Sequence, residues 1–114
     1  MEDNKRTCFA LIAASLVNKI QYNNVNDCQH AKTITVSSTN CSNFYDHNRG
    51  GYISGNGSSM FDHVTGTHVS INLNGNTVNC FDFESSNHIN FTVNGNNVSA
   101  FDFETSSHYN YSIS

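Results

Sequence analysis

The sequence predicts a mainly β (α+β) protein: an antiparallel β-meander of repeated 20-residue hairpins, with one N-terminal helix covering its apolar face. Three observations predict this fold class. The C-terminal half repeats itself every twenty residues, each repeat alternates apolar with polar residues around an Asn-Gly dipeptide, and an apolar run with helical spacing precedes the repeats. Alternation with a period of two is typical of a strand that buries one face.

The repeat is clearest where residues 81–88 recur as 101–108, displaced by 20 positions. An earlier copy begins at Phe61, and a degenerate copy begins 16 residues before it, at Tyr45. Residues 33–41 resemble a further degenerate, or worn, copy. Because a fixed interval indicates one structural unit used several times, we expect hairpins from Tyr45 to the C-terminus.

Each repeat is expected to contain two strands joined by a tight turn. Asn94-Gly95 suits a two-residue type I′ turn, in which both central residues take positive φ, and Asn74-Gly75 stands in the same place one repeat earlier. Residues 84–87 are expected to form a four-residue loop to the next hairpin. The pairs expected from these loops are Val93 with Asn96, Phe91 with Val98, Ile89 with Ala100, Phe83 with His88, Asp82 with Ile89 and Cys80 with Phe91.

The resulting meander of six or seven strands has two unlike faces. The aliphatic face carries Val69, Ile71, Leu73, Val78, Ile89, Phe91, Val93, Val98 and Ile113. The polar face carries Ser70, Asn72, Thr77, Asn79, Asn90, Thr92, Asn97, Ser99 and Asn110. Because a bare apolar face is not stable in water, we expect a cover: the helix, or else curling into a barrel or dimerisation. A parallel β-solenoid, in which one repeat makes one coil, is the alternative architecture.

Residues 5–19 are predicted to form the helix. Its apolar stripe has the i, i+3, i+4, i+7 and i+11 spacing of one helical face and consists of Phe9, Ile12, Ala13, Leu16 and Ile20. The two basic residues before this apolar run also resemble the start of a secretory leader, although Glu2 and Asp3 are unusual there.

One domain is expected over residues 1–114. Residues 1–20 are the helix or the leader, 21–50 an irregular segment or worn repeat, and 51–114 the hairpin repeats. A helix that belongs to the fold favours a cytoplasmic protein, whereas a leader would indicate a secreted one.

The chain is Asn-rich and weakly charged. It has 19 Asn, 15 Ser and 9 Thr among 114 residues, against five Lys or Arg and nine Asp or Glu, for a net charge of −4. Nucleic-acid binding needs concentrated basic residues, and so does attraction to anionic membranes, so neither partner is expected. No run approaches the roughly 18 consecutive apolar residues of a transmembrane helix.

No enzyme motif is present, and we expect neither catalysis nor a cofactor. Asp62, Asp82 and Asp102 recur beside loops, where carboxylates commonly accept backbone N–H bonds. The segment Asp46-His47-Asn48-Arg49-Gly50-Gly51 is expected to be a loop with a local salt bridge, the alternative being a site that acts on a phosphate or carboxylate.

No metal site is expected either. His68, His88 and His108 would lie on alternate strands, about 9.5 Å apart from the usual strand spacing, which is too far to share one ion. The cysteines lack a CxxC spacing, and Cys8 and Cys80 are expected to be buried thiols.

The candidate binding residues are repeated rings at one end of the polar face: His68, Phe81, Phe83, His88, Phe101, Phe103 and His108. Rings can stack on a pyranose while neighbouring amides and hydroxyls bind its hydroxyl groups. The sequence therefore predicts a non-catalytic binding module, for glycans. The alternative is a structural, self-associating or protein-binding role, as in a homodimer that pairs through edge strands, because the uncharged segment 109–113 is typical of an exposed edge.

Overall fold

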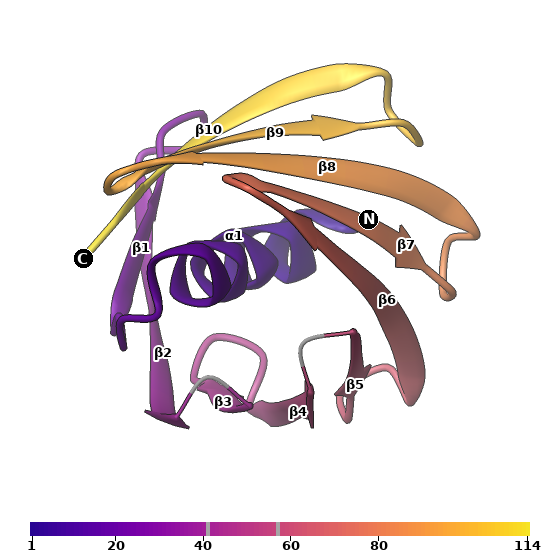
Figure 1. Ribbon diagram of the computed structural model, residues 1–114, viewed down its shortest axis with the longest axis horizontal. Coiled ribbons are helices and arrows are strands. Elements are labelled where there is room, and N and C mark those ends of the chain that lie inside the picture. Colours follow the sequence, from indigo (N-terminus) through magenta and orange to yellow (C-terminus); the bar gives the residue numbers. More distant parts are fainter. Residues whose placement is uncertain (41, 57) are drawn as a thin grey trace.

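The computed structural model describes residues 1–40, 42–56 and 58–114, which form one helix and a closed barrel of ten antiparallel strands. The helix is α1 (Asp3–Asn18). The strands are β1 (Asn24–Asp27), β2 (Lys32–Asn40), β3 (Asn43–Asp46), β4 (Gly51–Asn56), β5 (Ser59–Asp62), β6 (Thr67–Asn74), β7 (Thr77–Asp82), β8 (Asn87–Asn94), β9 (Asn97–Asp102) and β10 (Ser107–Ile113). Each strand pairs with its neighbours in sequence (Figure 1). The predicted mainly β meander is confirmed.

The alternative of a parallel solenoid is excluded, because all pairs of described strands are antiparallel. The repeat segment 51–114 contains the strands β4–β10, in line with the six or seven expected, and β1, β2 and β3 continue the meander through residues 21–50, where an irregular segment or worn repeat was expected. The C-terminal segment is not an edge, since β10 pairs with β9 on one side and with β1 on the other. Closure of the barrel thus removes the free edge on which the self-association alternative depended.

Helix α1 lies inside the barrel, where it covers the apolar face of the sheet. Figure 1 shows it at the centre of the ring of strands, and every residue from Lys5 to Leu16 is buried. Side chains alone just fill a barrel of about eight strands, so the wider ten-strand barrel has room for a helix. The small residues Ala10, Ala13 and Ala14 keep this helix narrow.

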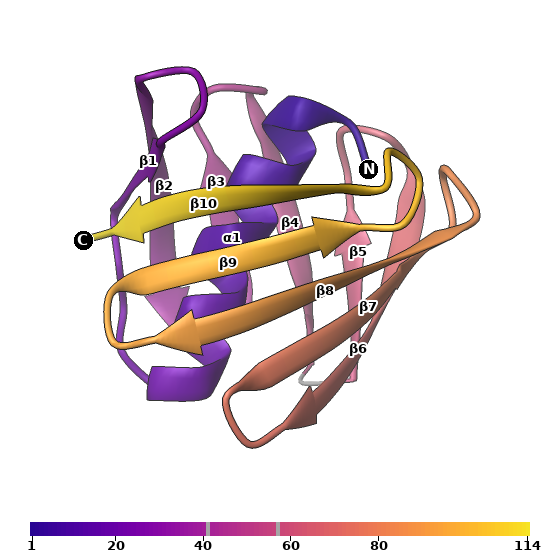
Figure 2. The same cartoon turned by 90° about the horizontal axis from the view of Figure 1, so that it is seen from above.

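The expected helix is confirmed, but its one-sided stripe is wrong. The barrel wall surrounds α1 (Figure 1 and Figure 2), so even Lys5 and Arg6 are buried. Ile20, which was expected in the stripe, lies beyond the end of the helix and is 51% exposed. Glu2 caps the first turn by accepting hydrogen bonds from two backbone N–H groups, and Lys19 ends the helix with φ 55°.

The two faces of the sheet are assigned as predicted, with one exception. The aliphatic residues point into the barrel and are buried, whereas Leu73, beside a tight turn, is 43% exposed. The predicted polar residues are exposed or half-buried on the outer wall.

The hairpin registers differ from the predicted ones by two residues, which keeps every side chain on its predicted face. Val93 pairs with Val98, so the turn is Gly95-Asn96, and only its glycine has positive φ, 58°. This arrangement fits a type II′ turn, which needs glycine only at the first central position. Asn94 therefore ends a strand, and its expected positive φ is wrong.

The longer loops also begin one residue earlier than predicted. Asp82 pairs with Asn87, which places Phe83 in the loop, and Cys80 pairs with Ile89. The cause is the Asp82 side chain, which accepts a hydrogen bond from the backbone N–H of Glu84 at 3.1 Å and so starts an Asx turn.

Candidate functional site

Aromatic and imidazole side chains lie close together on part of the outer wall of the barrel. They fall into four clusters, here called ring triads, that recur with the sequence repeat. The triads are Tyr45, His47 and Tyr52; Phe61, His63 and His68; Phe81, Phe83 and His88; and Phe101, Phe103 and His108. Together these twelve residues are called the aromatic belt.

Each triad is built in the same way from two strands and the loop between them. In the third, Phe81 stands on β7, Phe83 follows in the loop, and His88 stands on β8 directly opposite Phe81. The Phe81 ring centroid lies 4.9 Å from that of Phe83 and 4.8 Å from that of His88, with steep interplanar angles. These are edge-to-face contacts, the preferred geometry of aromatic pairs.

The seven predicted binding residues all lie in the belt. They make up the third and fourth triads and contribute His68 to the second. The third and fourth triads also touch each other, because the ring centroids of His88 and Phe103 lie 6.5 Å apart. The loop rings are the most accessible, with Phe83 56% and Phe103 50% exposed. Residues 21–50 do not cover them, because that segment contributes strands to the barrel itself.

Sequence reasoning missed the other five belt residues, which are Tyr45, His47, Tyr52, Phe61 and His63. The signal that finds them is the repeat: Tyr45-Asp46-His47 and Phe61-Asp62-His63 are copies of the segment that contains Phe81 and Phe83.

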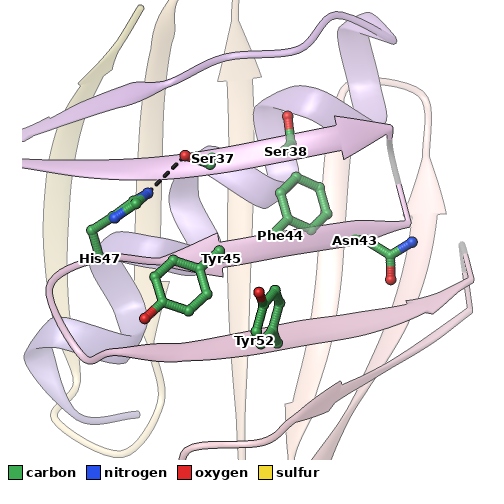
Figure 3. Close-up of a pocket in the computed structure, with 7 residues that line it drawn as sticks. All are labelled: Ser37, Ser38, Asn43, Phe44, Tyr45, His47 and Tyr52. Atoms are coloured by element: carbon green, nitrogen blue, oxygen red, sulfur yellow. Dashed lines mark hydrogen bonds between the residues drawn. The ribbon is translucent and has the colours of Figure 1, made fainter.

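The first triad differs from the others because it borders a hollow in the wall. Strands β2, β3 and β4 and the loop after β3 border an open hollow of about 410 Å³, lined by Ser37, Ser38, Asn43, Phe44, Tyr45, His47 and Tyr52. Figure 3 shows Tyr45, His47 and Tyr52 gathered beside one another along these strands. The β2–β3 register shifts between Ser38 and Asn40, and such an irregularity bends a strand away from its neighbour.

A ring of buried aspartates lies inside the barrel, at the end where the belt lies outside. Each is the last residue of an odd-numbered strand, and the members are Asp27, Asp46, Asp62, Asp82 and Asp102. Every one accepts a hydrogen bond from the backbone N–H two residues later, at 2.9–3.1 Å. The turn role expected for the repeated aspartates is therefore confirmed.

The same aspartates also form ion pairs with basic side chains, and the pairs with the helix were not indicated by the sequence. Lys5 Nζ on α1 lies 2.8 Å from Asp82 and 3.8 Å from Asp62, and the guanidinium of Arg6 lies 3.2 Å from Asp102. Arg49 forms the predicted salt bridge with Asp46, at 2.7 Å, and a second one with Asp62 at the same distance. These ion pairs hold the helix in place at this end of the barrel interior. The group is called the charged plug below and consists of Lys5, Arg6, Arg49, Asp46, Asp62, Asp82 and Asp102.

Two of the described cysteines, Cys8 and Cys80, suit structural roles better than reactive ones. Cys8 and Cys80 are buried as predicted, and burial raises the pKa of the Cys80 thiol to about 12 and that of Cys8 well above its usual value. Thiols of this kind are poor nucleophiles at neutral pH. Cys28 is exposed, and Cys41 lies outside the described residues.

His68, His88 and His108 stand on β6, β8 and β10, the alternate strands expected of them. Within the described residues, no group of three or more His, Cys, Asp or Glu is arranged to hold a metal ion. No described helix has both the length and the apolar character needed to cross a membrane.

Comparisons of the chain with protein-family models, curated proteins and solved structures find no match.

Proposed function

We propose that the protein is a non-catalytic binding module that holds a neutral glycan against its aromatic belt. The observation that carries the proposal is the exposure of the belt: Tyr52, Phe83 and Phe103 are each at least half exposed on a wall whose strands carry mainly polar residues outward. Clustered apolar side chains exposed in this way typically mark a binding surface.

The chemistry beside the rings suits sugars. Phe81 pairs across the sheet with Ser70, and Phe101 pairs with Asn90, so each strand ring has a hydroxyl or an amide directly next to it. A ring face accepts the C–H groups of a pyranose, and hydroxyls and amides both donate and accept hydrogen bonds. The belt therefore offers both kinds of contact that a sugar needs.

The distribution of charge favours a neutral ligand. From Asn43 to Ser114 the aspartates and Arg49 lie inside the barrel, and the remaining ionised side chains, Glu84 and Glu104, lie at its rim. The outer wall of β3–β10 thus carries polar and aromatic groups without formal charge. Such a wall attracts neither phosphate nor sulfate groups, whose binding depends on Lys and Arg.

The repetition of the triads favours a chain-like glycan. Successive triads are two strands apart, or about 9.5 Å from the usual strand spacing, a span that two sugar units of an extended chain cover. Linked contacts of this kind add avidity without any new type of contact. We therefore expect binding to strengthen as the glycan lengthens.

The test replaces the two exposed loop rings together, Phe83→Ser and Phe103→Ser. Binding is measured by affinity electrophoresis on soluble β-glucan, mannan and starch, beside a glycan array. The parent protein is expected to bind at least one of these polysaccharides, and the double variant to bind it at least about tenfold more weakly, which corresponds to about 1.4 kcal/mol.

The matched control is Leu73→Ser, which removes an exposed apolar side chain beside the Gly75-Asn76 turn at the other end of the barrel. It should leave binding unchanged, and far-ultraviolet circular dichroism should be the same for all three proteins. Equal binding by the double variant and the parent would contradict the proposal, as would a parent that binds none of the glycans. A concentration-dependent dimer lost in the double variant would instead assign the belt to a second copy of the chain.

A further inference from the structure

The hollow beside the first triad has the dimensions and the lining of a pocket for one small ring. Its volume of about 410 Å³ is near the lower end of the usual range for small-molecule sites. Its polar groups come from Ser37, Ser38, Asn43, Tyr45, His47 and Tyr52, and Phe44, which is buried, contributes an apolar part. None of the lining residues carries an acidic or basic side chain other than the His47 imidazole.

The first triad departs from the repeat in a way that adds hydrogen-bonding groups. The position of Tyr45 is occupied by Phe61, Phe81 and Phe101 in the other triads, and that of Tyr52 by His68, His88 and His108. Two phenolic hydroxyls are therefore present only here within the belt. The Tyr45 and Tyr52 rings lie 4.7 Å apart at 66°, so two ring faces of different orientation border the same hollow.

A hydrogen bond fixes the imidazole of this triad. His47 Nε2 lies 2.7 Å from the hydroxyl of Ser37 on β2, as the dashed line in Figure 3 shows. The bond ties the loop after β3 to β2 and orients the ring against Tyr45, whose centroid is 4.8 Å away. The ring positions at the hollow are thus set before any ligand arrives, which lowers the entropic cost of binding.

We propose that this hollow, here called the tyrosine pocket, binds a single neutral pyranose unit, as a free sugar or as the end of a chain. The inference rests on the proposed function for the class of ligand only, because the pocket is separate from the loop rings Phe83 and Phe103. One tyrosine ring stacks on the sugar, while the two phenols and the amide of Asn43 bind its hydroxyl groups.

The decisive variant restores the repeat: Tyr45→Phe together with Tyr52→His gives the first triad the strand rings that the second, third and fourth triads already carry. This change keeps ring contacts that the same barrel accommodates elsewhere, so folding should be preserved. Asn43→Ala, at an exposed position of β3, provides an independent second variant.

Binding is measured by saturation-transfer NMR with glucose, galactose, mannose and N-acetylglucosamine as the probes. At least one sugar should give a saturable signal with the parent, weakened at least tenfold by the double variant and several-fold by Asn43→Ala. The inference is overturned if no probe gives a saturable signal, or if the double variant binds as the parent does.

The two proposals fail in different ways. If the Phe83→Ser and Phe103→Ser protein still binds the monosaccharide while losing the polysaccharide, both proposals hold. Loss of monosaccharide binding from that protein would overturn the separate pocket. A parent that binds a monosaccharide but no polysaccharide would overturn the belt and leave the pocket standing.

Discussion

Lys5 illustrates at the level of one residue how this barrel handles buried charge. Its ammonium group is fully enclosed and lies within 4 Å of Asp62, Asp82 and Glu84. Removing a charge from water is costly, and a nearby opposite charge repays that cost only while it is present. The stability of the protein should therefore depend strongly on keeping each partner.

Asp82→Asn tests this dependence. The asparagine keeps the side-chain oxygen that starts the loop but removes the nearest of the three negative charges around Lys5, so the unfolding free energy should fall by about 3 kcal/mol. The matched control is Asp3→Asn, which removes a carboxylate that is 60% exposed in its pair with Arg6 and should cost less than about 1 kcal/mol. Urea denaturation measures both. Similar losses in the two variants would contradict a special role for the buried pair.

His30 and Asp27 form an ion pair at the end of the barrel where the aromatic belt lies. The contribution of this pair to stability should depend on pH. The hydrogen bond to Asp27 raises the pKa of His30; burial opposes ionisation of Asp27, but hydrogen bonds from His30 and Gln29 outweigh it and lower the pKa of Asp27. A raised histidine pKa stabilises the fold below the unfolded value of about 6.5, and a lowered aspartate pKa stabilises it above about 3.9. The pair is therefore fully effective between these two values.

His30→Ala should consequently lower the melting temperature more at pH 5.5 than at pH 9, because the contribution of His30 is lost as pH rises through its folded pKa. Thermal denaturation at both pH values measures the difference. In an Asp27→Asn protein the same His30→Ala change should lose this dependence on pH. An effect of His30→Ala that is equal at both pH values in the parent would show that the charged pair contributes no stability.

Among the elements, α1 has the most unusual environment. A helix on a protein surface needs only one apolar stripe, but the barrel wall surrounds α1, so residues on every side of it are buried. The helix fills a lumen that the inward side chains of ten strands leave open. Its packing should therefore be as sensitive to lost volume as any core.

Leu11→Ala tests that packing, since Leu11 is fully buried on α1. The cavity should lower the unfolding free energy by about 2–5 kcal/mol. Ile20→Ala, just past the helix and 51% exposed, should change it by less than about 0.5 kcal/mol. Chemical denaturation compares the two, and a tolerant Leu11 would mean that the helix packs loosely in the barrel.

At the scale of the whole molecule, the repeat made the meander predictable, because alternation and turn residues agree in each copy. The placement of the seven candidate rings on one wall followed from the same pattern, and a register error of two residues did not disturb it. Curling into a barrel was one of the covers that the apolar face left open, but the strands that close the barrel were not predictable: β1 and β2 carry few repeat residues, and nothing local indicates that Val25 pairs with Ile113.

The charged plug was hidden for a related reason. In the sequence, Lys5 and Arg6 resemble the basic start of a secretory leader, and the aspartates resemble ordinary turn residues. Only the three-dimensional arrangement brings these two groups, far apart in the sequence, to the same end of the lumen. Sequence periodicity reports which face a residue occupies, whereas pairing between distant elements depends on the closed topology.

Closure of β1 against β10 has a consequence for the kinetics of folding. The seam between them joins the two ends of the meander, so we expect it to form after the intervening hairpins, and until it forms α1 has an incomplete wall around it. Contacts between residues so distant in sequence slow folding, and open sheets with exposed apolar faces are the species that aggregate. The pairing of β10 with β1 should therefore limit the rate of folding. Chaperones or a low protein concentration should reduce aggregation most before this pairing has formed.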